Sequence, residues 1–181
     1  MGVTTSSTVA ATYEPLITYT VPSAVATVTL GSGGQGTIPS TYTDLVLIAL
    51  GKTTDGAAYR TLLIRPNNDT NSNYSVTYMG GDGSTAYSNR TTNESSLRCG
   101  YLQGSGSIQT SIISFFNYSN STTYKTALIR YGGNTDAVDA QTNAQVGLWR
   151  STSAITSFVL SAGAGNIDAG SIFTLYGIKG A

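Results

Sequence analysis

Short segments in which apolar and polar residues alternate recur along the chain, and this pattern constrains the fold more than any other feature. A period of two matches a β-strand, whose successive side chains point to opposite faces. In Ala24–Leu30, for example, the even-numbered residues are Ala, Ala, Val and Leu and would share one face. The pattern predicts strands at Leu16–Val21, Ala24–Leu30, Asp44–Leu50, Tyr59–Arg65, Tyr74–Met79, Ser96–Leu102, Ile108–Phe116, Tyr124–Arg130, Ala144–Arg150, Ile155–Ser161 and Ser171–Ile178.

Turn-forming residues separate these segments. Gly, Asn and Asp cluster between them because they tolerate positive φ or cap their own backbone, as in Asn67–Asn73 and Gly80–Ser84. The four prolines are expected to flank strands, since proline lacks a backbone donor. Asp44–Leu50 is apolar on both faces, which predicts a central strand covered on both sides. We therefore predict an all-β fold, an antiparallel β-sandwich of the jelly-roll-like kind, with little helix.

The length of 181 residues suits one domain. Residues 14–181 carry the strand pattern and are predicted to form a single β-sandwich. Residues 1–13 are small and polar and offer little to pack. They are either a frayed terminus or an extended N-terminal arm, in which Val3, Val9 and Tyr13 would contact a neighbouring subunit. They lack the cationic and apolar regions of a signal peptide.

The composition removes several classes of function. Gly, Ser, Thr and Asn make up 82 of the 181 residues, charged residues only 10%, and the net charge is zero. A nucleic-acid-binding surface needs clustered Lys and Arg, so no nucleic-acid partner is expected. The chain has no histidine, which excludes Ser-His-Asp hydrolysis and His-ligated zinc. No apolar run reaches the length of a membrane-spanning helix, so no membrane association is expected.

Other short motifs are better explained by structure than by chemistry. Gly31–Gly36 satisfies the G-x-G-x-x-G pattern, but no helix pattern follows, so we expect a hairpin loop rather than a dinucleotide site. Gly104-Ser105-Gly106-Ser107 has no histidine to activate a serine. Cys99 is expected to be a buried thiol. Asp136 and Asp139 match no calcium-binding loop and are expected in a solvated loop. We expect no enzyme activity, cofactor or metal, although spacing alone leaves a pair of glycosidase carboxylates open.

Tyrosine is the residue type that suggests a binding surface. The chain has 12 Tyr against 4 Phe and 1 Trp, and tyrosine suits surfaces that meet other surfaces. The most polar stretch of the chain supplies the candidate surface-binding residues Tyr74, Tyr78, Tyr87, Asn89 and Arg90. They could stack on sugar, contact a protein, or be ordinary half-buried strand residues. Trp149 is expected in the core.

One heptapeptide pattern occurs twice. Tyr59–Arg65 and Tyr124–Arg130 share the pattern Y-[RK]-T-x-L-I-R, and both are bordered by Asn-rich turns. A repeat architecture would recur more often than this. Either a duplicated hairpin unit or coincidence accounts for the similarity.

Two longer segments resemble a known group of proteins. Ile38-Pro39-Ser40-Thr41-Tyr42-Thr43-Asp44-Leu45-Val46-Leu47 and Gly170-Ser171-Ile172-Phe173-Thr174-Leu175-Tyr176-Gly177-Ile178-Lys179 are similar to segments of small virion proteins of tailed bacteriophages, notably marine and cyanobacterial ones. Asn73-Tyr74-Ser75 and Tyr124-Lys125-Thr126 add to the resemblance, which covers most of residues 15–181. It implies a β-sandwich virion component that decorates capsids or forms fibre and tail-tip knobs, often as a trimer. It carries no catalytic or ligand residues.

These observations predict a non-enzymatic virion structural protein, made in the bacterial cytoplasm. The leading hypothesis is a capsid decoration or cement subunit that contacts the major capsid protein and its own copies, as a homotrimer. The alternative is a tail-fibre or tail-tip knob that binds a host surface glycan.

Overall fold

The computed structural model describes residues 12–104, 109–134 and 140–179. Its regular elements are all strands, which run as follows: β1 (Tyr13–Thr20), β2 (Thr27–Gly31), β3 (Asp44–Gly51), β4 (Tyr59–Pro66), β5 (Tyr74–Gly81), β6 (Ala86–Glu94), β7 (Leu97–Gln103), β8 (Gln109–Phe116), β9 (Lys125–Asn134), β10 (Ala140–Trp149), β11 (Ser157–Ala162) and β12 (Ile172–Ile178).

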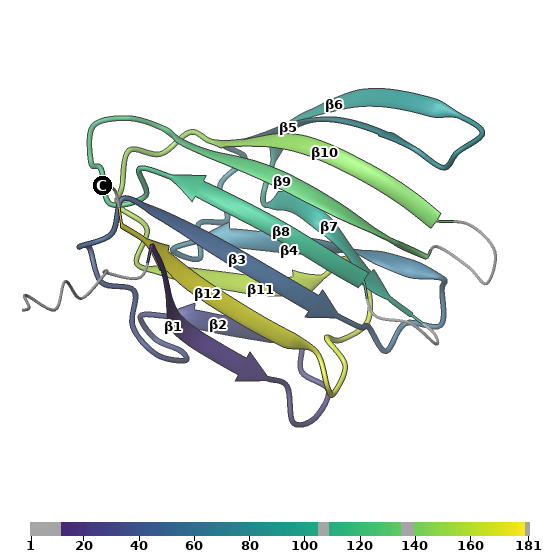
Figure 1. Ribbon diagram of the computed structural model, residues 1–181, viewed down its shortest axis with the longest axis horizontal. Coiled ribbons are helices and arrows are strands. Elements are labelled where there is room, and N and C mark those ends of the chain that lie inside the picture. Colours follow the sequence, from purple (N-terminus) through teal and green to yellow (C-terminus); the bar gives the residue numbers. More distant parts are fainter. Residues whose placement is uncertain (1–11, 105–108, 135–139, 180–181) are drawn as a thin grey trace, which may run out of the picture.

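These strands form two antiparallel sheets packed as a sandwich (Figure 1). The larger sheet has eight strands in the order β1-β12-β3-β8-β9-β10-β5-β6, and the smaller has four in the order β2-β11-β4-β7. In Figure 1 the smaller sheet lies behind the larger one, and the β5–β6 hairpin extends past it at the upper right. The predicted all-β, jelly-roll-like antiparallel sandwich is confirmed.

The core lies between the sheets and follows the predicted alternation. Leu45, Leu47 and Ala49 of β3 are buried against the smaller sheet, whose Leu62 and Ile64 are also fully buried. The rings of Phe115 and Phe158 pack across the interface with centroids 4.6 Å apart. We call the face of the larger sheet that meets this core its inner face, and the opposite one its outer face.

β3 occupies the central position that its sequence predicts, but its two faces differ. On the outer face Val46 is buried, whereas Ile48 and Leu50 remain partly exposed. Neither sheet of the sandwich lies over this face. The prediction that β3 is covered on both sides is therefore wrong for the described part of the chain.

The N-terminal boundary differs from expectation, and so do two prolines, of which Pro66 is the last residue of β4. Tyr13 is the first residue of β1 and pairs with Ile178, so it belongs to the sandwich and not to the arm. Val3 and Val9 lie outside the described residues. Pro15 lies inside β1 rather than before it, at a point where the register shifts between Pro15 and Ile17. β1 is an edge strand, where a missing N–H need not interrupt a ladder.

The turns use the residues that the sequence indicates. Asn67, Asn68 and Asn117 adopt φ values of 52°, 54° and 49°, a region that asparagine tolerates. In the β5–β6 turn, Asp82 Oδ1 accepts hydrogen bonds from Ser84 N, Ser84 Oγ and Thr85 N at 2.9, 2.9 and 2.7 Å. Gly31–Gly36 forms a tight loop in which Gly34 N donates to Gly31 O, and no helix follows it.

Candidate functional site

The strands β5 and β6 carry the predicted surface-binding residues, but the first of them is not at the surface. Tyr74 is fully buried, and its ring stacks with that of Trp149 at a centroid distance of 6.3 Å. Its hydroxyl donates to the carbonyl of Asp69 at 2.8 Å. Burial raises the pKa of Tyr74. Tyr74 is thus a core residue, because the smaller sheet covers this end of β5, and it cannot contribute to an exposed surface.

The remaining four residues are divided between the two faces of the larger sheet. Tyr78 pairs with Asn89, and both side chains lie on the inner face, together with Tyr87. Arg90 pairs with Thr77 and lies on the outer face. Residues adjacent in a strand point in opposite directions, so Asn89 and Arg90 cannot bind one ligand on a single face.

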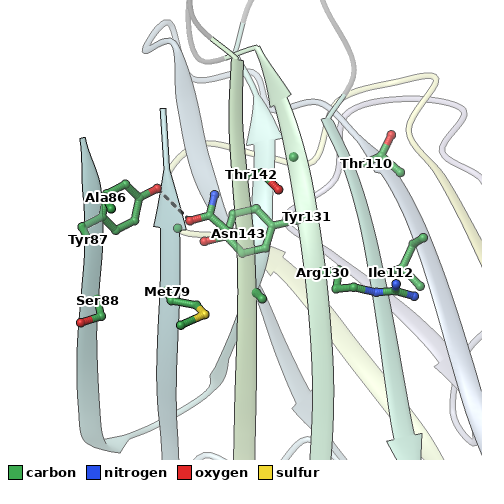
Figure 2. Close-up of a pocket in the computed structure, with 13 residues that line it drawn as sticks. Met79, Ala86, Tyr87, Ser88, Thr110, Ile112, Arg130, Tyr131, Thr142 and Asn143 are labelled. Carbon is green, nitrogen blue, oxygen red and sulfur yellow. Dashed lines mark hydrogen bonds between the residues drawn. The ribbon is translucent and has the colours of Figure 1, made fainter. Parts of the chain in front are cut away.

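Tyr78 and Tyr87 already have partners within the protein. Their rings pack edge to face with centroids 6.5 Å apart. The Tyr87 hydroxyl donates to Asn143 Oδ1 at 2.8 Å, the dashed line in Figure 2. Burial is the main cause that raises the pKa of Tyr87. The two rings keep part of their surface exposed at the open side of the sandwich.

Three further tyrosines extend this cluster between the sheets. The Tyr101 ring lies 4.3 Å from that of Tyr59 and 5.0 Å from that of Tyr131, centroid to centroid. Gln145 Nε2 donates to the Tyr131 hydroxyl at 2.7 Å. These tyrosines could not be grouped from the sequence, because strand order alone brings β4, β7 and β9 together.

A small hollow beside this cluster has a volume of about 60 Å³. It is lined by Thr61, Tyr78, Arg98, Gly100, Tyr101, Tyr131 and Gln145. Small-molecule sites measure roughly 300–1,000 Å³, so this hollow suits a few water molecules rather than a ligand. The tyrosine cluster is therefore mainly a packing feature of the open end of the sandwich.

A much larger groove crosses the outer face of the larger sheet (Figure 2). Its volume is about 890 Å³, and its lining comes from five adjacent strands, β8, β9, β10, β5 and β6. One cross-strand row contains Ile112, Arg130, Ala144, Met79 and Ser88 in register. A second row contains Thr110, Gly132, Thr142, Gly81 and Ala86. Between these two rows lie Tyr87, Gly80, Asn143 and Tyr131, which also belong to the lining. The groove thus combines aliphatic side chains, hydroxyl groups and one guanidinium with two tyrosines and an asparagine.

Exposed apolar side chains continue from the groove along the outer face. Met79 is 63% exposed, Val146 52%, and Leu128 and Phe116 43% each. Val146 and Leu128 are direct cross-strand neighbours. Exposed apolar side chains gathered on one face favour a surface that contacts another molecule. We take the groove and this patch together as the candidate functional site.

The remaining predicted motifs have structural roles or lie outside the described residues. Cys99 is fully buried, and burial raises the pKa of its thiol, so the prediction of a buried thiol is confirmed. Trp149 is in the core, as predicted. Asp136, Asp139 and the serines at 105 and 107 are not among the described residues.

The described residues lack two further features that a functional site could use. They include no group of three or more His, Cys, Asp or Glu side chains placed to hold a metal ion. The same part of the chain has no helix long and apolar enough to cross a membrane.

Comparisons with known proteins assign this chain to no family. No protein-family model matches the chain, and no curated protein matches it significantly. Among solved structures, the chain is similar to "Crystal Structure of Caenorhabditis elegans galectin LEC-6", at 9% sequence identity and a TM-score of 0.36. The match covers 90% of this chain and 96% of the galectin chain.

Proposed function

We propose that this protein is a non-enzymatic structural subunit of a tailed-phage virion, and specifically a capsid decoration or cement subunit. It would contact the capsid and its own copies, as a homotrimer, through the outer face of the larger sheet. The carrying observation is the exposed apolar patch of Met79, Leu128, Val146 and Phe116 on that face.

An exposed apolar face is unfavourable for a free-standing protein. Apolar side chains left in water forgo about 25 cal/mol for each Å² that a partner could cover. The patch belongs to a chain in which only 10% of residues are charged, so few charges oppose association. Long edge strands such as β6 also expose unpaired backbone groups, which natural proteins protect or pair. In an assembly, neighbouring subunits would cover the apolar patch and protect the exposed edge of β6.

The test measures the protein on purified virions of the phage that encodes it. Leu128→Asp and Val146→Asp place a charge on the patch, and Thr27→Asp, on an exposed position of β2, is the matched control. We expect both patch variants to fold with wild-type circular dichroism but to be lost from particles, while Thr27→Asp is incorporated normally. Normal occupancy of the patch variants would contradict the proposal. A wild-type copy number close to that of the major capsid protein would support a decoration role over a tail role.

The predicted arm can be tested in the same assay. Because Tyr13 is part of β1, the deletion has to stop at residue 11 to leave that strand whole. We expect removal of residues 1–11 to weaken incorporation, since Val3 and Val9 are the predicted subunit contacts. Unchanged occupancy would limit the contact to the sheet face.

The second candidate, a tail-fibre or tail-tip knob that binds host glycan, is favoured by one arrangement. Tyr78 and Tyr87 are partly exposed beside the exposed Asn89, all on the inner face of the overhanging β5–β6 hairpin. Aromatic faces next to amides suit sugar stacking. A glycan array would give reproducible hits that Tyr78→Ala and Asn89→Ala abolish, and that the exposed Tyr124→Ala keeps. A low copy number per virion would accompany this outcome.

A further inference from the structure

We propose that the groove on the outer face binds an extended segment of a partner protein that presents a carboxylate to Arg130 between aliphatic side chains. This inference rests on the proposed function, because it names the chemistry of the partner at the same face. The partner segment would be acidic, whereas the net charge of this chain is zero.

The dimensions of the groove suit an extended chain. Its lining residues come from five adjacent strands, so it runs across four strand spacings. At about 4.8 Å per spacing this is roughly 19 Å, the length of about six extended residues. The small residues Gly132 on β9 and Ala144 on β10 lie in the middle of the groove, and the larger side chains of Met79 and Ile112 lie on either side of them. A backbone could therefore approach the sheet closely at the centre.

The charge of the groove selects the partner. Arg130 is exposed within it and forms no ion pair with any described residue. Arg90 adds a second exposed guanidinium on the same face, opposite Thr77. Asp82, in the turn between β5 and β6, uses one carboxylate oxygen to accept three hydrogen bonds from its own turn. A carboxylate from outside would pair with Arg130 in the fork geometry that guanidinium favours.

The apolar part of the lining favours a peptide over a saccharide. Apart from Arg130, the lining side chains on the outer face are aliphatic or hydroxylic, with Met79, Ala86, Ala144 and Ile112 as the apolar ones, and Tyr87, Tyr131 and Asn143 complete the lining. The rings of Tyr87 and Tyr131, on the same strands, belong to the inner-face row of Asn143. These two rings therefore lie off the row that contains Arg130, where Met79, Ala144 and Ile112 are placed for the aliphatic side chains of a peptide to pack on. The chain's own residues 1–11 contain no Asp or Glu and lack the complementary charge.

The test uses the full chain, labelled with ¹⁵N, and two synthetic probe peptides. Both alternate Val and Thr over six residues; one has a central Glu and the other a central Lys. We expect the Glu peptide to shift the amide resonances of Met79, Arg130 and Ala144, and to bind more weakly as salt is raised. The Arg130→Glu variant should bind the Glu peptide at least tenfold more weakly than the wild type does. The same variant should bind the Lys peptide instead. Arg130→Lys should retain part of the affinity, and Arg65→Glu, on the smaller sheet, should bind as the wild type does.

Several results would overturn the inference. Equal binding of both peptides, shifts confined to another surface, or no binding would each do so. Binding of an acidic oligosaccharide in preference to the Glu peptide would assign the groove to a different partner. Concentration-dependent self-association that Arg130→Glu abolishes would assign it to a second copy.

Failure of this inference can be told apart from failure of the proposed function. If Val146→Asp is lost from virions while Arg130→Glu is incorporated and neither peptide binds, the contact face stands and the acidic partner does not. If Val146→Asp is incorporated normally, the structural role itself fails.

Discussion

The indole nitrogen of Trp149 donates a hydrogen bond to the carboxylate of Asp69 across 2.8 Å, joining the end of β10 to the turn after β4. The oxygen that accepts this bond, Asp69 Oδ2, also accepts a hydrogen bond from Asn73 Nδ2 at 2.8 Å. The other carboxylate oxygen accepts from Asn71 N and Asn71 Nδ2 at 2.9 and 2.7 Å. One turn carboxylate thus satisfies the only polar atom of a tryptophan side chain that is 2% exposed.

Removal of this carboxylate should destabilise the fold. Asp69→Ala leaves the Trp149 N–H without an acceptor and releases the turn, at an expected cost of about 1–3 kcal/mol in the free energy of unfolding. Urea denaturation followed by tryptophan fluorescence measures this directly. Asp168→Ala, in a distant turn, is a control for loss of a turn carboxylate. Equal effects of the two substitutions would show that the Trp149 contact adds nothing.

The same carboxylate should make stability depend on pH. Burial by itself raises the pKa of Asp69, but hydrogen bonds from Asn73, Asn71 and Trp149 outweigh it and hold that pKa below its usual value. A depressed carboxyl pKa contributes stability that is present above about pH 4 and is lost as the pH falls through the folded-state value. Asp69→Asn should therefore show a smaller loss of stability between about pH 4 and pH 2 than the wild type. An equal loss in the free energy of unfolding of the two proteins over this pH range would refute the prediction.

Gly80 leaves room for the Tyr87–Asn143 hydrogen bond. A Cβ at position 80 would lie 2.2 Å from Asn143 Oδ1 and 2.8 Å from the Tyr87 hydroxyl, so Gly80→Ala has to displace both groups. We expect a loss of about 1–3 kcal/mol in the free energy of unfolding. Gly56→Ala is the matched control, because a Cβ there meets nothing within 4 Å. Thermal unfolding of the two variants should separate them, and a Gly80→Ala protein as stable as the control would disprove the steric argument.

Arg150 stabilises the β5–β6 hairpin at the end away from its turn. Its guanidinium donates to Ser75 Oγ at 2.6 Å, Ser72 O at 3.1 Å and Asn93 Oδ1 at 3.2 Å, linking β5 to β6. Arg150→Ala should loosen β6 locally, by about 1 kcal/mol, and speed hydrogen exchange at Thr91 and Thr92. Arg150→Lys should restore little, because an ammonium cannot reproduce the fork. Exchange rates unchanged from the wild type would place the stability of β6 elsewhere.

Cys99 should be inert in the folded protein. Its side chain is fully buried, and burial raises the pKa of the thiol, which keeps the reactive thiolate scarce. Alkylation by iodoacetamide, followed by mass spectrometry, should be slow in native buffer and rapid in urea. Fast native labelling would mean that β7 opens readily.

How far the sequence predicts this fold depends on whether a strand has a buried face. β3 and β12 lie in the interior of the larger sheet, and their alternation gave positions close to those observed. β6 was not predicted at all. It is an edge strand whose residues are mostly exposed on both faces, so Ala86–Glu94 carries no apolar period. A strand that pairs with one neighbour and buries neither face shows no alternation of apolar and polar residues in its sequence.

The same gap explains why the candidate site was only partly identified. Without a strand at residues 86–94, Tyr87, Asn89 and Arg90 had no assigned faces, and they were grouped by proximity along the chain. Once β6 pairs with β5, Arg90 belongs to the outer face and Asn89 to the inner one. The groove residues Ile112, Arg130 and Ala144 come from three different strands, so strand order, which the sequence does not encode locally, is what assembles them.

The repeated heptapeptide shows what alternation alone can determine. Tyr59–Arg65 lies entirely within β4 of the smaller sheet, and all of Tyr124–Arg130 except Tyr124 lies within β9 of the larger one. In each, the Ile before the final Arg is fully buried, so matching positions point toward the core from opposite sheets. The shared pattern therefore fixes which way the side chains point but not which sheet the strand joins.

The pairing of β1 with β12 has a consequence for rearranging the order of the chain. Tyr13 lies opposite Ile178, and Lys179 N donates to Thr12 O at 3.2 Å, so residues 12 and 179 are neighbours at one edge of the larger sheet. A circular permutant could join these two positions through a few glycines and open at the exposed turn between β5 and β6. Its new ends would then emerge beside the groove, where a fused peptide could be presented to Arg130 at high local concentration.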